Sequence, residues 1–99
     1  MADKSLGQHW LKNREILDEI ADLAVSGDSE LCLEIGPGLG TLTSSLLKRF
    51  SKVLAVEFDP RLAANLPKSF PGKNLEVINE DILKFDFSAI SGNCFITIN

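Results

Sequence analysis

The stretch LCLEIGPGLGTLTSSLL, residues Leu31–Leu47, decides the fold expected for this chain. Its first part, Leu31–Ile35, is a short apolar run typical of a strand buried on both faces. The run breaks into a glycine-rich turn, and helical spacing of apolar residues begins at Thr41, which we expect to be the N-cap. A strand, a glycine-rich turn and a helix in this order predict a ligand site at the carboxyl end of a parallel strand.

Similar patterns continue on the C-terminal side of this stretch. Apolar runs predict three further strands, at Lys52–Val56, Asn74–Ile78 and Cys94–Ile98. Helical patterns separate the first strands, so the fold class is α/β with parallel strands covered on both sides. We expect a Rossmann-like fold, the first half of a doubly wound sheet with about four strands and flanking helices.

Two more helices flank the expected strands. Residues 14–25, REILDEIADLAV, place apolar residues at helical spacing and predict an amphipathic helix. A shorter helix should begin with Asp59 as N-cap and Pro60 in the first helical position, and end at Pro67. The sequence assigns no regular structure to residues 82–91.

Length and composition narrow the class of protein. The chain has 99 residues, 44% of them hydrophobic and 24% charged, which indicates one globular domain and excludes disordered, collagen-like and coiled-coil classes. No apolar run reaches the roughly 20 residues of a membrane span, and the first residues, MADKSLGQHW, lack the apolar core of a signal peptide, so we expect a cytoplasmic protein with no membrane contact. Cys32 and Cys94 lie in apolar runs and are expected in the core, not in a disulfide or a metal site.

The charge distribution bears on nucleic-acid binding. The net charge of −4 argues against a nucleic-acid binder of the basic-patch type. Residues 1–14 nevertheless carry Lys4, Lys12 and Arg14 against Asp3, so contact with a polyanion would start at the N-terminal arm.

Carboxylates near the strand ends indicate the kind of ligand. The turn holds Gly36, Gly38 and Gly40, but Pro37 removes one N–H donor that a pyrophosphate would need. The acids at or after successive strands are Glu34, Glu57 and Asp81. A ligand with a ribose, an adenine and a cationic centre suits these carboxylates better than a dinucleotide does, and S-adenosylmethionine has all three features.

Roles for the acids follow from their positions. Glu57 should accept hydrogen bonds from the ribose hydroxyls and play no part in the core, so that Glu57→Ala would leave folding unchanged. Asp81 should accept from the adenine amino group, with Ile82 beside the ring. For Glu34 two roles remain open, bracing the glycine turn or facing the ligand's ammonium group.

Five blocks of the sequence together carry a resemblance to a known family. They are KSLGQHWL (Lys4–Leu11), LEIGPGLGTLT (Leu33–Thr43), VLAVEFDPRLA (Val53–Ala63), NLEVINEDILKFDF (Asn74–Phe87) and the final Ile98-Asn99. In this order they resemble the ribosomal RNA small-subunit adenine N6,N6-dimethyltransferases, which are class I S-adenosylmethionine-dependent methyltransferases. The macrolide-resistance methyltransferases are close relatives and an alternative assignment.

The resemblance implies further site residues. Residues 1–12 would be an arm that folds over the cofactor through Gln8, His9 and Leu11, and residues 13–99 a partial cofactor-binding domain. Asn99 would start the catalytic motif that holds the target adenine's amine next to the cofactor. No metal is implied, and the partner would be ribosomal RNA in the small subunit.

Since the sequence stops at Asn99, we expect an N-terminal fragment that is inactive alone. We expect it to self-associate through an exposed sheet edge or to be partly disordered. Two other readings remain. One is a nicotinamide dinucleotide-binding oxidoreductase domain, and the other is a folding or binding module without activity of its own.

Overall fold

A computed structural model describes residues 30–90 and 94–98 of the chain. This part contains one sheet of four parallel strands in the order β3-β2-β1-β4. The strands are β1 (Leu31–Ile35), β2 (Lys52–Glu57), β3 (Leu75–Asn79) and β4 (Phe95–Ile98). This order confirms the predicted α/β class and the first half of a doubly wound sheet.

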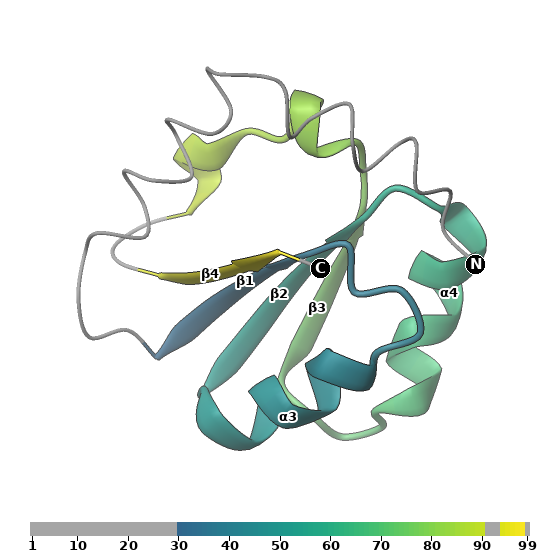
Figure 1. Cartoon of the computed structure of the whole chain (residues 1–99), viewed down its shortest axis with the longest axis vertical. Helices are drawn as coiled ribbons and strands as arrows, with labels where there is room; N and C mark the ends of the chain where they lie inside the picture. The colour runs from purple at the N-terminus through teal and green to yellow at the C-terminus, as the bar shows by residue number, and fades with distance from the viewer. Residues whose placement is uncertain (1–29, 91–93, 99) are drawn as a thin grey trace.

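The two faces of the sheet are covered differently (Figure 1). Helices α3 (Thr41–Arg49) and α4 (Pro60–Ser69) lie on one face. The segment for which the sequence predicted no structure forms two 3-10 turns, η1 (Ile82–Lys84) and η2 (Phe87–Ala89), on the other face. Neither α-helix of residues 30–90 has the length and apolar character that crossing a membrane requires.

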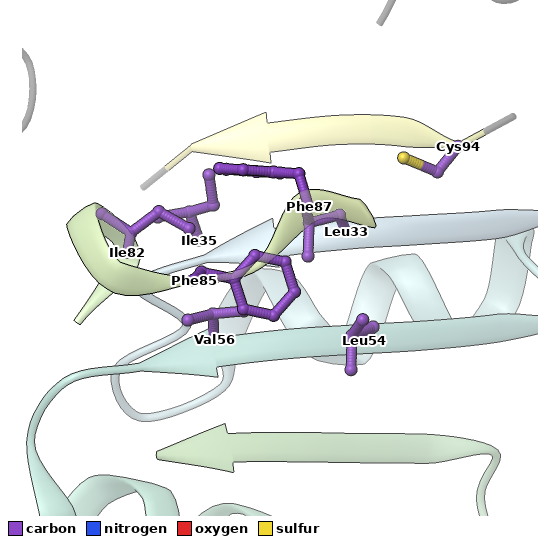
Figure 2. Packing of buried hydrophobic residues seen from close by; sticks show 8 residues of the cluster. All are labelled: Leu33, Ile35, Leu54, Val56, Ile82, Phe85, Phe87 and Cys94. Atoms are coloured by element: carbon purple, nitrogen blue, oxygen red, sulfur yellow. The ribbon is translucent and has the colours of Figure 1, made fainter. Parts of the chain in front are cut away.

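The alternation of side chains along β1 and β2 produces two core layers. One layer contains Leu33, Ile35, Leu54 and Val56 from the strands, together with Ile82, Phe85, Phe87 and Cys94 (Figure 2). The rings of Phe85 and Phe87 meet edge to face, with centroids 5.1 Å apart. The 3-10 turns therefore cover this face because they bring their apolar residues onto the sheet.

The second layer lies under the helices. Cys32 of β1 and Val53 of β2 pack there with Leu46 of α3. Cys32 and Cys94 are both buried free thiols, in different layers, which confirms the prediction that they are core residues.

The start of α3 differs from the prediction. Its N-cap is Gly40 and not Thr41, with a φ of 91° and no side-chain hydrogen bond. The turn closes tightly because Gly40 donates its N–H to the carbonyl of Pro37 at 3.0 Å. Threonine rarely adopts such a positive φ, so Thr41 becomes the first helical residue instead.

Helix α4 begins as predicted and ends later. The carboxylate of Asp59 accepts the N–H groups of Arg61 at 2.8 Å and Leu62 at 3.3 Å, which confirms Asp59 as N-cap with Pro60 following it. The prediction that Pro67 ends the helix is wrong, because α4 continues to Ser69. The missing N–H of Pro67 costs one helical bond only, and the last turn closes when Phe70 donates to the carbonyl of Pro67 at 3.2 Å.

Candidate functional site

The predicted ligand site lies at the carboxyl edge of the sheet. The glycine turn follows β1, Glu57 ends β2, and Asp81 follows β3 by two residues. These strands are neighbours in the order β3-β2-β1 and run parallel, so their carboxyl ends lie side by side. The structure thus brings together the groups that the sequence predicted to act together.

The glycine turn is held by its own main chain. The φ angles of Gly36, Gly38 and Gly40 are 72°, 60° and 91°, values that residues other than glycine rarely adopt. Gly36 donates its N–H to the carbonyl of Val56 at 2.9 Å, and Gly38 donates to the carboxylate of Glu57 at 3.0 Å. With the Gly40 bond to Pro37, the N–H groups of all three glycines bind the protein itself, unlike those of a turn that presents donors to a pyrophosphate.

Gly40 also allows a close approach between two elements. A Cβ atom at this position would lie 2.7 Å from Cδ1 of Leu66 and 2.9 Å from Cε2 of Phe70. Leu66 belongs to α4 and Phe70 caps its C-terminus, so the main chain at the start of α3 packs directly against these two side chains. A Cβ on Gly38, in contrast, would meet nothing within 4 Å, so the middle of the turn faces open space.

Glu57 is part of the folded framework. Its side chain is buried, at 2% exposure, and its carboxylate accepts the N–H of Gly38 at 3.0 Å and that of Asp59 at 2.9 Å. This corrects the expectation that Glu57 plays no part in the core. The correction arises because β2 extends one residue further than predicted, so Glu57 lies inside the sheet on the side of the helices.

Glu34 braces α3. It is completely buried, and its carboxylate accepts the hydroxyl of Thr43, which is also fully buried in α3. Of the two roles left open by the sequence, the structure favours the brace, because a side chain with no exposed surface is enclosed by the protein.

Asp81 lies two residues after Asn79, which pairs with Glu57 in the sheet. Its carboxylate caps η1 by accepting the N–H of Leu83 at 3.0 Å, and the residue is half-buried. The side chain of Ile82, expected beside the adenine ring, is 5% exposed and packs in the core layer of Figure 2. Of Asp81 and Ile82, only Asp81 therefore has a partly exposed side chain at this edge of the sheet.

Two residues at this edge were missed by the sequence reasoning. Phe58 directly follows Glu57 at the end of β2, the strand that lies between β1 and β3. It leaves 48% of its surface exposed. Asn79 donates through its side-chain amide to the carbonyls of Glu57 and Phe58, both at 2.9 Å. The available signal for Phe58 was an aromatic residue beside an acid at a strand end, and for Asn79 an amide at the next strand end.

Several predicted site residues cannot be placed. Gln8, His9, Leu11 and Asn99, and with them the arm of residues 1–12 and the helix of residues 14–25, lie outside the described residues. Within residues 30–90 and 94–98, no group of three or more His, Cys, Asp or Glu side chains is arranged to hold a metal ion.

The arrangement fits an adenosyl ligand with a positive charge. Acidic groups lie at two adjacent strand ends, the exposed aromatic residue Phe58 directly follows one of them, and the glycine turn leaves open space beside Gly38. The anionic phosphates of a dinucleotide would meet these carboxylates at a turn whose glycine N–H groups are already bonded.

Comparison with known proteins agrees with this geometry. The family model described as ribosomal RNA adenine dimethylase matches residues 1–96. The chain belongs to this family. The family resemblance inferred from the five sequence blocks is thereby confirmed.

Individual relatives of the ribosomal RNA adenine dimethylase family cover most of the chain. A probable dimethyladenosine transferase from Dictyostelium discoideum is 46% identical over 88 residues, covering 85% of the chain. A ribosomal RNA small subunit methyltransferase A from Alkaliphilus oremlandii is 45% identical over 84 residues, covering 84%. The crystal structure of a dimethyladenosine transferase from Plasmodium falciparum superposes with a TM-score of 0.60, at 36% identity, over 89% of the chain.

The chain is much shorter than these family members. It spans 28% and 29% of the two curated relatives and 33% of the crystallised chain. Within that part, the likeness in sequence and structure assigns the Rossmann-like class I methyltransferase fold to the chain.

Proposed function

We propose that this chain binds S-adenosylmethionine as the methyl donor for a ribosomal RNA adenine N6,N6-dimethyltransferase. The observation that carries the proposal is the combination, at one sheet edge, of acidic strand ends with a glycine turn whose N–H groups bind the protein itself. Membership of the ribosomal RNA adenine dimethylase family supports the same ligand.

Each part of the ligand has a candidate partner. Glu57 would accept the ribose hydroxyls, Asp81 would accept the adenine amino group, and the exposed ring of Phe58 would lie against the base. The open side of Gly38 would receive the methionine end. When bound, S-adenosylmethionine supplies a methyl group already activated by its sulfonium, so the residues of the chain have to bind and orient it.

The acceptor that we propose is an adenine of small-subunit ribosomal RNA. The names of the relatives support it, since they describe dimethyladenosine transferases and a ribosomal RNA small subunit methyltransferase. Asn99 as the residue that holds the adenine amine, and Gln8, His9 and Leu11 as residues that cover the cofactor, stay predictions. So do a cytoplasmic location and self-association through a sheet edge, which light scattering would test.

Calorimetric titration tests the proposed ligand. We expect S-adenosylhomocysteine to bind saturably to the chain and NAD to give no heat of binding. Saturable binding of NAD without a response to the adenosyl ligand would overturn the proposal in favour of an oxidoreductase domain. Methyl transfer from labelled S-adenosylmethionine to unmodified small-subunit RNA then tests the acceptor.

A further inference from the structure

The carboxylate of Glu57 joins two segments that are distant in sequence. One oxygen, Oε1, accepts the N–H of Gly38 in the turn before α3, at 3.0 Å. The other, Oε2, accepts the N–H of Asp59, the N-cap of α4, at 2.9 Å. Both oxygens of the side chain proposed to bind the ribose therefore accept hydrogen bonds from main-chain donors.

This arrangement limits the access of a ribose. An ionised carboxylate can accept about four hydrogen bonds, so two further hydroxyl groups could in principle be accommodated. Glu57 is only 2% exposed, however, which leaves no room for a ribose to reach its free lone pairs. For the diol to bind, a group that covers the carboxylate has to move, and the two main-chain donors bonded to it are in direct contact with it.

The two groups differ in how firmly they are held. Asp59 is fixed because its own carboxylate caps α4 and its carbonyl accepts the N–H of Ala63 at 2.9 Å. Gly38 lies in the middle of the turn, is half-exposed, and has open space on its Cβ side. The Gly38 N–H is therefore the donor that can leave.

We infer that Glu57 is a positioning residue as well as a ligand-binding one: it holds the glycine turn through Gly38, and the ribose diol displaces this N–H when it binds. The first half rests on the hydrogen bonds alone, and the second rests on the proposed function. It follows that the position of the glycine turn depends on the ribose hydroxyls and not on the adenine.

The first experiment needs no ligand. Hydrogen exchange of the Gly38 amide is followed by heteronuclear NMR in the chain and in Glu57→Ala, which has no side-chain acceptor for the Gly38 N–H. We expect exchange at Gly38 to become about tenfold faster or more, while the core amide of Leu54 changes little, since a hydrogen bond to a charged acceptor is lost. Glu76→Ala, on the exposed part of β3, is the matched control. Exchange at Gly38 within twofold of the parent in a folded Glu57→Ala would overturn the positioning role.

The second experiment uses the unaltered chain and stays informative if Glu57→Ala does not fold. Adenosine and 2′,3′-dideoxyadenosine carry the same base and differ in the ribose hydroxyls. We expect both to shift the amide resonance of Leu83, beside Asp81, and only adenosine to shift that of Gly38. Equal shifts of Gly38 with both compounds, or a shift with neither while Leu83 responds, would overturn the displacement.

The proposed function and the displacement can fail separately, because a response of Leu83 without the expected response of Gly38 overturns the displacement alone. If neither nucleoside nor S-adenosylhomocysteine changes any resonance at the highest concentration used, the proposed function and the displacement are both overturned. The ligand-free exchange at Gly38 would still decide whether Glu57 holds the turn.

Discussion

The carboxylate of Glu57 accepts the backbone N–H of Gly38 at 3.0 Å across 19 residues of sequence. This bond connects the end of β2 to the turn after β1, and through Asp59 it reaches the start of α4. The Glu57 side chain therefore joins the two loops that form the candidate site. We expect its removal to lower both the stability of the fold and the affinity for the ligand.

Glu57→Ala should destabilise the fold as well as weaken ligand binding. The substitution leaves the N–H groups of Gly38 and Asp59 without their acceptor, and a hydrogen bond to a charged group contributes about 1.5–3 kcal/mol. Urea denaturation measures the loss. Glu76→Ala is the control, because Glu76 forms an exposed ion pair with Lys52 that contributes about 0–1 kcal/mol. Equal stability of the two variants would contradict the framework role of Glu57.

Gly40→Ala should be more destabilising than Gly72→Ala. Both glycines have a positive φ, of 91° and 72°, so both variants incur the left-handed strain of roughly 1–2 kcal/mol. Only the methyl group at 40 meets neighbours, Leu66 at 2.7 Å and Phe70 at 2.9 Å, and crowding in a packed region adds about 1–3 kcal/mol. Thermal or urea melts of the pair separate the two effects. Similar losses of stability in the two variants would mean that Leu66 and Phe70 can shift to accommodate the methyl group without destabilising the fold.

Thr43→Val should destabilise the chain although it preserves the shape of the side chain. The hydroxyl of Thr43 donates to the buried carboxylate of Glu34, and a hydrogen bond to a charged group contributes about 1.5–3 kcal/mol. Thr41→Val, at the exposed first position of α3, makes the same chemical change at the surface. Denaturation midpoints of the two variants provide the measurement, and a loss no greater at 43 than at 41 would rule out the brace.

Phe58→Ala should weaken binding of S-adenosylhomocysteine and leave stability nearly unchanged. The ring is 48% exposed, so the fold depends little on it, whereas stacking of a base on an aromatic ring contributes about 1–3 kcal/mol. Calorimetry should show a loss of roughly fivefold to a hundredfold. Phe58→Tyr keeps the ring and should bind normally. Affinity that is unchanged in Phe58→Ala would place the base elsewhere.

The buried thiol of Cys32 should make stability decline in alkaline solution. Burial, with smaller contributions from Glu34 and Cys94, raises the pKa of Cys32 from 9.0 to about 12. The unfolded chain therefore releases this proton at lower pH than the folded chain does. The resulting stabilisation is fully present below pH 9.0 and is lost as the pH rises from there towards 12.

Urea denaturation between pH 8 and pH 10 measures this decline, and Cys32→Ala provides the comparison. The variant has a cavity and lower stability at every pH, but its stability should fall less steeply with pH because the titrating thiol is gone. Parallel pH profiles for the two proteins would show that Cys32 does not contribute.

Local sequence patterns determined the fold. Apolar runs of about five residues, helical spacing and the Asp59-Pro60 cap depend on neighbours within a few positions, so the order of strands and helices, the parallel sheet and the buried cysteines followed from them. The position of the site followed as well, because parallel strands bring the residues after them to a common edge.

Tertiary structure alone decided how the residues at that edge are used. Whether Glu57 is a surface acid or a buried link depends on Gly38, 19 residues away, and whether Glu34 contacts a ligand or a helix depends on Thr43. At Gly40, the side chains of Leu66 and Phe70 leave no room for a Cβ atom, a contact that no local pattern contains. Sequence periodicity specifies which face of an element is buried, but the partner of a polar group is set by elements that meet only in the folded chain.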